Sequence, residues 1–260
     1  MSLVGIRGKP YVDLSPFIDT SIFPDLDREI TSALCRVETS YTGATLKWMG
    51  VVAPWMMDDG YLDAMHAIEE LDDRDRADFI ALGDGDEAAT EFGDETDHPF
   101  TFAQMRWLSF RRGVYFPWKV CFHFVENDRW EDKHSGTGKG FSPEAEREFP
   151  KTVAFIKSLP FKEIGRAVLF GIEPNDHAPA HRDSEPGASL VIAQSISFDP
   201  RGDKGLYLES ATRDEKVVVK APVFWFNDAD YHGVDPAPRF RYSIRVDGVF
   251  DPTFVRRILG

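Results

Sequence analysis

Residues 222–246, PVFWFNDADYHGVDPAPRFRYSIRV, contain two strand-like runs separated by a turn. Val223–Phe226 follows a proline, which marks the start of a strand. Phe240–Val246 alternates apolar and polar side chains with the period of two that a strand requires. Between them, Asp235-Pro236-Ala237-Pro238 supplies the fixed φ angles and polar side chains of a turn. Two β-strands joined by a turn are therefore predicted here.

Similar short runs of β-branched and aromatic residues precede this stretch. Turn signals such as Pro174-Asn175-Asp176 separate them. Many short strands with turns between them are typical of a β-sandwich or a barrel. The predicted upstream strands are Ala167–Ile172, Leu190–Ile196, Leu206–Leu208 and Val217–Val219.

The first 160 or so residues are predicted to be richer in helix. The densely acidic stretch Asp72–His98 is interpreted as a solvated, mobile connection, and the aromatic stretch Phe100–Val125 as one or two strands. We expect residues 1–260 to form a single domain, with substrate-side elements in 1–160 and the metal and cosubstrate core in 161–250. The predicted helices follow Pro24-Asp25, cover Tyr61–Leu71, and begin at Ser142-Pro143 and Pro150.

The charge of the chain limits its partners. Thirty Lys and Arg residues against 44 Asp and Glu residues give a net charge of −14, which repels nucleic acid and anionic lipid surfaces. Arg111-Arg112, with Lys119 nearby, is the nearest candidate for a basic patch. The sequence has no apolar run long enough to span a bilayer and no signal-peptide pattern at its start, so a cytoplasmic protein is expected.

The segment Ala180-His181-Arg182-Asp183-Ser184 follows the predicted strand Ala167–Ile172 and its turn. In an extended backbone, side chains two residues apart project to the same side, so His181 and Asp183 can converge on one ion while Arg182 points away. Two histidines and one carboxylate fill three of six octahedral positions, an arrangement that suits Fe(II). The remaining histidine must come from elsewhere in the chain.

His232 is the predicted second histidine. Of the seven histidines, it is the one that lies in a later strand pair with apolar support. His177 competes for the role because it lies four residues before His181, but it has no carboxylate two residues on. We therefore interpret His177 as a loop residue or one that supports the ligands.

The last predicted strand carries polar residues on one face. Polar side chains that point into the interior of a protein require a partner to bind. A dicarboxylate cosubstrate supplies one, because a guanidinium binds a carboxylate through two charge-assisted hydrogen bonds and a serine hydroxyl donates a third. Arg245 is either a second residue that binds a carboxylate or an ion-pair partner near Asp247. The period of two places Arg241, Ser243 and Arg245 on this face, and Phe240, Tyr242, Ile244 and Val246 on the other.

These residues resemble a known pattern. His181-Arg182-Asp183, His232 and Arg241-Tyr242-Ser243 are similar in order and separation to the H-x-D, H and R-x-S pattern of Fe(II)/2-oxoglutarate-dependent dioxygenases. The resemblance covers roughly Arg166 to Phe250. It implies an α+β protein with a mainly β core, a double-stranded β-helix (jelly-roll, cupin-like) barrel flanked by N-terminal helices. The proline-containing turn before the H-x-D also resembles the aspartyl/asparaginyl β-hydroxylase branch, from which no substrate is carried over.

The resemblance also implies the cofactors and the reaction. Fe(II) is expected on His181, Asp183 and His232, and the distal carboxylate of 2-oxoglutarate on Arg241 and Ser243. Dioxygen converts 2-oxoglutarate to succinate and carbon dioxide, and a C–H bond of the substrate is oxidised. Halogenating relatives carry a small residue at the position of Asp183, so hydroxylation or desaturation is favoured here.

Two other classes of function compete with this hypothesis. A cupin-like metal enzyme that does not use 2-oxoglutarate would leave Arg241 and Ser243 unexplained. A non-catalytic jelly-roll binding module is disfavoured because all three candidate ligands are present. The acidic composition and the lack of repeats favour a free small molecule or amino acid over a large protein as substrate, and the sequence gives no indication of the oligomeric state.

Overall fold

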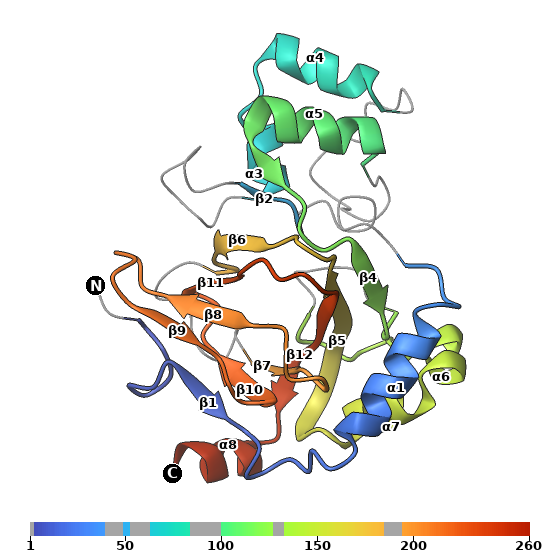
Figure 1. Ribbon diagram of the computed structural model, residues 1–260, viewed down its shortest axis with the longest axis vertical. Helices are drawn as coiled ribbons and strands as arrows, with labels where there is room; N and C mark the ends of the chain where they lie inside the picture. The colour runs from blue at the N-terminus through green and yellow to red at the C-terminus, as the bar shows by residue number, and fades with distance from the viewer. Residues whose placement is uncertain (1–2, 40–48, 53–62, 84–99, 127–132, 185–193) are drawn as a thin grey trace.

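Two antiparallel sheets form the core of the computed structural model, which describes residues 3–39, 49–52, 63–83, 100–126, 133–184 and 194–260 (Figure 1). The larger sheet has the order β1-β10-β7-β12-β5-β4 and the smaller one β6-β11-β8-β9. The strands of the larger sheet are β1 (Tyr11–Asp13), β4 (Val120–His123), β5 (Phe161–Ile172), β7 (Ser195–Phe198), β10 (Val223–Phe226) and β12 (Arg241–Phe250). Those of the smaller sheet are β6 (Ala178–His181), β8 (Leu206–Glu209), β9 (Lys216–Val218) and β11 (Tyr231–Val234).

From β5 to β12 the chain passes back and forth between the two sheets. β5, β7, β10 and β12 belong to the larger sheet, while β6, β8, β9 and β11 belong to the smaller one. This alternation is the winding of a double-stranded β-helix, so the predicted jelly-roll barrel with a mainly β core is confirmed. β1 and β4 come from the first half of the chain and extend the larger sheet at its two edges.

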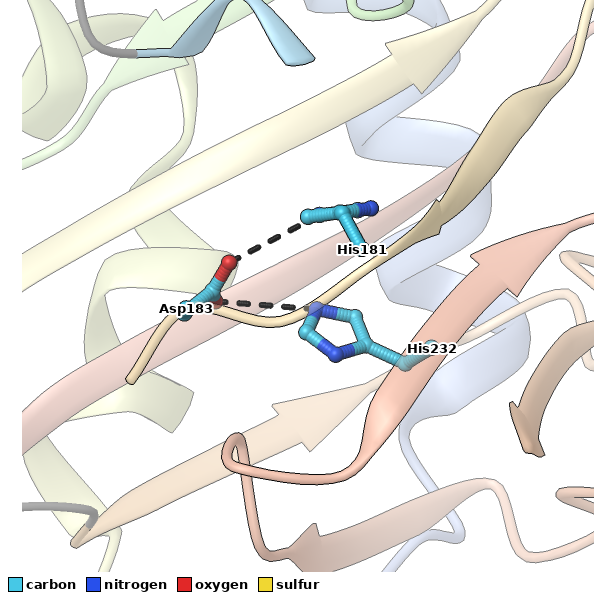
Figure 2. Close-up of side chains that lie close together, drawn as sticks. All are labelled: His181, Asp183 and His232. Atoms are coloured by element: carbon cyan, nitrogen blue, oxygen red, sulfur yellow. Dashed lines mark ion pairs between the residues drawn. The ribbon is translucent and has the colours of Figure 1, made fainter. Parts of the chain in front are cut away.

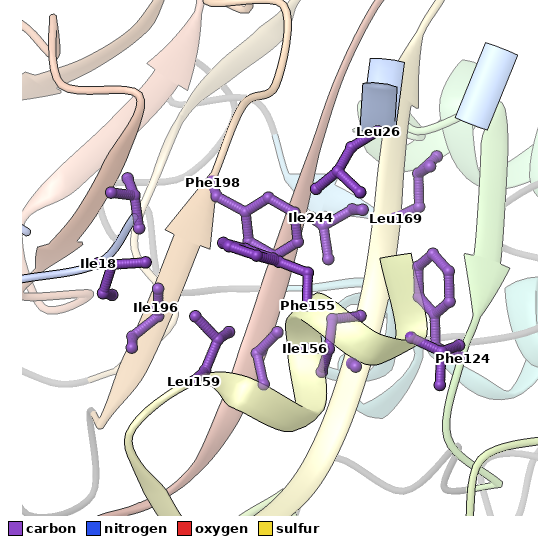
Figure 3. Close-up of a cluster of buried hydrophobic side chains, with 14 of the residues drawn as sticks. Ile18, Leu26, Phe124, Phe155, Ile156, Leu159, Leu169, Ile196, Phe198 and Ile244 are labelled. Carbon is purple, nitrogen blue, oxygen red and sulfur yellow. The ribbon is translucent and has the colours of Figure 1, made fainter. Parts of the chain in front are cut away.

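The two faces of β12 have different neighbours, as the period of two predicts. Tyr242, Ile244 and Val246 belong to the main hydrophobic cluster, which α1 (Phe23–Ala33) and α7 (Pro150–Ser158) cover (Figure 3). Aromatic pairs tie these helices to the sheet, since the Phe155 ring lies 5.0 Å from that of Phe198. The polar face of β12 is therefore directed into the barrel.

Several predicted elements are confirmed at their predicted ends. α1 begins at Phe23 with Pro24 in its first turn, and β10 occupies Val223–Phe226. α6 (Pro143–Glu148) begins after Ser142, whose Oγ accepts a hydrogen bond from the Ala145 amide, and α7 begins at Pro150. A final helix, α8, covers Pro252–Leu259. Across the described parts of the chain, no helix combines the length and the apolar character that a membrane span requires.

The prediction of one or two strands in Phe100–Val125 holds for the second half of this stretch and misses a helix in the first half. Residues Phe102–Arg112 form helix α5, and only β3 (Val114–Tyr115), which pairs with β2 (Val51–Val52), and β4 are strands. A capping box decides this: the Thr101 side chain accepts from the Gln104 amide, and the Gln104 side chain accepts from the Thr101 amide. Gly113, with φ of 66°, then ends the helix in the left-handed region.

The acidic stretch Asp72–His98 contains a helix where a mobile connection was predicted. Helix α4 (Asp73–Ala81) starts with a capping bond from the Asp75 amide to the Asp72 side chain. Arg111 and Arg112 of α5 both bind the buried Asp75 carboxylate, so this basic pair shares an acidic partner within the fold. The rest of the acidic stretch, residues 84–98, lies outside the described residues. The predicted helix Tyr61–Leu71 is confirmed as α3 (Ala64–Glu69), apart from residues 61–62, which also lie outside them.

Candidate metal centre

His181, Asp183 and His232 meet inside the barrel. His181 at the end of β6 and His232 on β11 are directly paired across two antiparallel strands, and their ring centroids are 4.4 Å apart. Asp183 follows two residues after His181, beyond the strand, and projects toward both rings (Figure 2). One ligand atom from each of the three residues lies within 4.8 Å of the others. Among the described residues, no other group of histidine, cysteine and acidic side chains has this geometry.

Local structure sets the position of the two strands. Asn175 adopts a left-handed φ of 66° in the turn between β5 and β6, and its amide donates to the Ala237 carbonyl in the turn between β11 and β12. Asparagine tolerates this conformation better than most residues. The two turns are thus joined to each other at the same end of the smaller sheet.

The hydrogen bonds of the histidines leave one nitrogen of each ring directed at Asp183. The Nδ1 of His181 lies 2.8 Å from the Pro179 carbonyl, and the Nδ1 of His232 lies 3.1 Å from the Asp230 carbonyl. Because a carbonyl can only accept, each Nδ1 carries the hydrogen and each Nε2 of a neutral ring carries a lone pair. The Nε2 of His181 is buried and has no hydrogen-bond partner in the described part of the chain. Both Nε2 atoms lie 3.6 Å from an oxygen of Asp183.

The charges of this group are those that metal ligands require. Burial, followed by the neighbouring His232, lowers the pKa of His181 to about 4, so its imidazole is neutral near neutral pH. Burial alone would raise the pKa of Asp183, but His232 and Arg245 beside it hold this pKa well below its ordinary value. Two imidazoles and a carboxylate are the donor set of a 2-His-1-carboxylate Fe(II) site. The residues present therefore fit the metal that the sequence predicts.

Aromatic side chains enclose both imidazoles. The Trp118 ring lies 5.3 Å from that of His181, and the Phe226 ring lies 4.9 Å from that of His232. His177 lies outside the cluster: its ring is half-buried and packs against Tyr115 at 4.8 Å. The structure thus groups His181, not His177, with Asp183 and His232.

Arg245, predicted to bind either the cosubstrate or an acidic neighbour, contacts three carboxylates. Its Nε donates to Asp247 and its Nη2 to Asp228, each at 2.8 Å, and its Nη1 donates to Asp183. Asp247 in turn accepts from the fully buried Arg166 at 2.6 and 2.9 Å. Of the two roles considered for Arg245, these contacts are those of the ion-pair partner.

Arg241 and Ser243 lie further along the same face of β12. The guanidinium of Arg241 is 2% exposed as a residue and donates to the backbone carbonyls of Lys204, Asp235 and Asp176. Its Nε has no partner. The Ser243 hydroxyl is hydrogen-bonded to the Nζ of Lys204. Arg241 and Ser243 thus form one polar group together with a lysine that the sequence did not single out.

Lys204 is a buried lysine that forms no ion pair within the described residues. Its residue is 7% exposed, its Nζ lies 5.7 Å from the centre of the Phe170 ring, and no carboxylate in the described part of the chain forms an ion pair with it. Burial lowers the pKa of Lys204 to about 7. Charges are expensive to bury without a counter-ion, so the pair Arg241 and Lys204 forms a positively charged site suited to an anion.

Sequence reasoning missed two residues of this interior. Lys204 follows the turn Asp199–Asp203, whose proline, glycine and charged residues are typical of a solvated loop. Asp228, two residues after β10, was not distinguished from the turn around it, although it is 1% exposed. For Asp228 the only signal was an acidic residue just after a strand that is buried on both faces.

The sequence matches no protein-family model and no curated protein. The structure is similar to a 2OG-Fe(II) oxygenase family oxidoreductase from Burkholderia pseudomallei, at a TM-score of 0.31 and 11% identity over 49% of this chain and 66% of that one. It is also similar to a Pseudomonas putida prolyl-4-hydroxylase, at 0.29 and 15% identity over 43% of this chain and 68% of that one. A cupin domain from Bordetella pertussis matches at 0.23 and 10% identity over 32% of this chain and 78% of that one. With every TM-score below 0.5, we base the fold on its strand order and the site on its own geometry.

Proposed function

We propose that this protein is an Fe(II)- and 2-oxoglutarate-dependent oxygenase that oxidises a C–H bond of a small molecule, an amino acid or a peptide. One observation carries the proposal: two imidazoles and a carboxylate converge inside a double-stranded β-helix, where the Nε2 of His181 is buried and has no hydrogen-bond partner among the described residues. His181, Asp183 and His232 would hold the iron. Once bound, iron would activate dioxygen for oxidation of the substrate.

The side chains around the metal residues have separate tasks. The carbonyls of Pro179 and Asp230 hold the two imidazoles in the tautomer that presents Nε2 to the metal. Trp118 and Phe226 pack against the rings and keep water from one side of the site. The carboxylate of Asp183 supplies the negative charge that offsets part of the charge of the metal. Its presence also favours hydroxylation or desaturation over halogenation, because it occupies the position that a halide ligand would need.

The positively charged site next to Ser243 supports the cosubstrate assignment. Arg241 and Lys204 are buried, and the acceptors that they contact are neutral carbonyl or hydroxyl oxygens. The distal carboxylate of 2-oxoglutarate would offset this charge and accept hydrogen bonds from Lys204 and Ser243. A cupin-like enzyme independent of 2-oxoglutarate would give these buried cations no such partner.

The test is succinate release from 2-oxoglutarate by the purified protein with Fe(II) and air, across a panel of amino acids, peptides and small metabolites. We expect one Fe(II) per chain and succinate formation that the correct substrate stimulates. His232→Ala should abolish high-affinity iron binding, and Asp183→Gly should reduce turnover by more than about 100-fold, because each variant lacks one of the three ligands.

Two results would contradict the proposal. Unchanged iron stoichiometry and activity in His232→Ala would remove this residue from the metal site. Tight iron binding by the wild type without any 2-oxoglutarate binding would favour the cupin-like alternative. A calorimetric titration of 2-oxoglutarate into the protein loaded with Zn(II) measures cosubstrate binding without turnover. It therefore distinguishes the cupin-like alternative, in which 2-oxoglutarate does not bind, from a panel that lacks the correct substrate.

A further inference from the structure

Asp228 is hydrogen-bonded to the segment that carries Asp183 at two points. Its backbone carbonyl accepts from the Asp183 amide at 2.9 Å, and its Oδ1 accepts from the Ser184 hydroxyl at 2.8 Å. Asp183 and Ser184 lie just beyond the end of β6, where strand pairing no longer fixes the backbone. Asp228 therefore supplies hydrogen bonds to the backbone of Asp183 and to Ser184, where no neighbouring strand pairs with the chain.

The other oxygen of Asp228 binds the guanidinium that holds Asp183. Oδ2 accepts from Nη2 of Arg245 at 2.8 Å, and Lys133 lies 3.6 Å from the same oxygen. Asp247 accepts a hydrogen bond from Nε of Arg245 at 2.8 Å. With Nε and Nη2 bound, the planar guanidinium cannot rotate, and Nη1 is directed at Oδ2 of Asp183.

These contacts fix which oxygen of Asp183 faces each neighbour. Oδ2 binds Arg245 and lies 3.6 Å from the Nε2 of His232, while Oδ1 lies 3.6 Å from the Nε2 of His181. The group is balanced in charge, because Arg166, Arg245 and Lys133 accompany Asp183, Asp228 and Asp247. A carboxylate held in this way has one fixed orientation relative to the two imidazoles.

We propose that Asp228 and Arg245 are positioning residues that fix the orientation in which the Asp183 carboxylate faces the metal. The inference rests on the proposed metal site but goes beyond it, because neither residue touches the metal. In this arrangement Asp228 fixes the backbone at Asp183, and Arg245 fixes its carboxylate. Loss of either contact would let the carboxylate rotate, which weakens metal binding and changes the coordination geometry.

The experiment uses the full chain and Co(II), whose visible absorption reports coordination number and geometry. In Asp228→Asn we expect the Co(II) dissociation constant to rise about 10- to 100-fold, the range typical for residues that support metal ligands, with a change in the shape of the spectrum. Arg245→Lys, which keeps the charge but not the fork, should show the same spectral change. Asp25→Asn is the matched control, since it breaks the exposed ion pair between Asp25 and Lys151 on the helical side of the protein.

Ser184→Ala covers the case in which Asp228→Asn does not fold. It removes one hydrogen bond to Asp228 from a half-buried position and should raise the Co(II) dissociation constant a few-fold. Melting temperatures without metal establish that each variant is folded. Wild-type affinity and spectrum in Ser184→Ala and in folded Asp228→Asn would overturn the inference. Absence of Co(II) and Fe(II) binding in the wild type would instead overturn the proposed function on which the inference rests.

Discussion

Arg241 and Arg245 lie on the same face of the same strand, four residues apart, and both are buried, yet their surroundings differ. Three carboxylates bind Arg245. Arg241 donates only to neutral backbone carbonyls, and its neighbour Lys204 only to the Ser243 hydroxyl. The charge of Arg245 is therefore compensated by direct ion pairs, whereas no carboxylate in the described part of the chain forms an ion pair with Arg241 or Lys204.

The comparison indicates which arginine can take part in binding an anion. A guanidinium that binds three carboxylates has little capacity left to bind a further anion. Its role is to hold those carboxylates in place. A buried cation without an acidic partner lowers its free energy by binding an anion. The sequence predicts the same role for both arginines, since the period of two places them on the same face of the strand. Only their hydrogen-bond partners in the structure distinguish them.

Replacing Arg241 should have the largest effect on cosubstrate binding. We expect Arg241→Ala to weaken 2-oxoglutarate binding by about 2 to 4 kcal/mol, or roughly 30- to 1000-fold, while Fe(II) binding stays nearly intact. Arg241→Lys should restore part of the affinity, because a point charge replaces a planar fork. Calorimetry of 2-oxoglutarate binding and of metal binding measures the two effects separately. Wild-type cosubstrate affinity in Arg241→Ala would transfer the role to Lys204 or refute it.

Lys204 should make cosubstrate binding depend on pH. Burial lowers its pKa from 10.5 to about 7, so raising the pH above about 7 removes the charge that the carboxylate needs. The affinity for 2-oxoglutarate should fall between pH 7 and 9 in the wild type, and Lys204→Met should be about 10- to 100-fold weaker at pH 6.5 with a flatter pH profile. Titrations at several pH values test this. An unchanged slope in Lys204→Met would exclude the lysine.

The same pKa shift affects stability in the opposite direction. Between about pH 7 and 10.5 the unfolded chain keeps its proton on Lys204 while the folded protein has lost it. The contribution of Lys204 to the free energy of unfolding therefore rises with pH across this window when no anion is bound. Comparing urea midpoints of the wild type and Lys204→Met over this range checks the sign.

Ser243→Ala should give the smallest effect of the series. Its hydroxyl contributes one neutral hydrogen bond, so we expect 2-oxoglutarate binding to weaken by about 0.5 to 1.5 kcal/mol, or roughly 2- to 12-fold. Metal affinity should not change, since Ser243 contacts Lys204 and none of the three metal residues. A larger loss than in Arg241→Ala would mean that the serine and the lysine, rather than the arginine, bind the carboxylate.

Local patterns predicted those parts of the molecule that local forces determine. Pro222 and the polar residues after Phe226 set the ends of β10, and the spacing of His181 and Asp183 predicted their convergence before any contact was known. Helix α5 was missed because its aromatic composition favours strands, whereas the capping box at Thr101 and Gln104 decides the outcome. For α5, the capping residues at the helix ends predict the secondary structure better than its amino-acid composition does.

The buried charges required knowledge of the fold. Asp199 accepts from the amides of Gly202 and Lys204, which closes a turn and directs the chain inward at Lys204. Nothing in the sequence distinguishes this lysine from one in a solvated loop. Asp228 likewise gains its role only when the end of β6 lies beside it. Such residues depend on contacts between segments that are far apart in the chain.

β6, which carries His181, is an edge strand within the described part of the smaller sheet, where only β11 pairs with it. Its ladder is short, and its register shifts between His232 and Val234. Edge strands of this kind open more readily than central ones, and their amides exchange with solvent at a lower free-energy cost. A metal ion that joins His181 to His232 would act as a cross-link between the two strands. Hydrogen exchange of the β6 amides would then slow on metal loading more than exchange in the long β5–β12 ladder, and an edge strand would become one of the protected parts of the barrel.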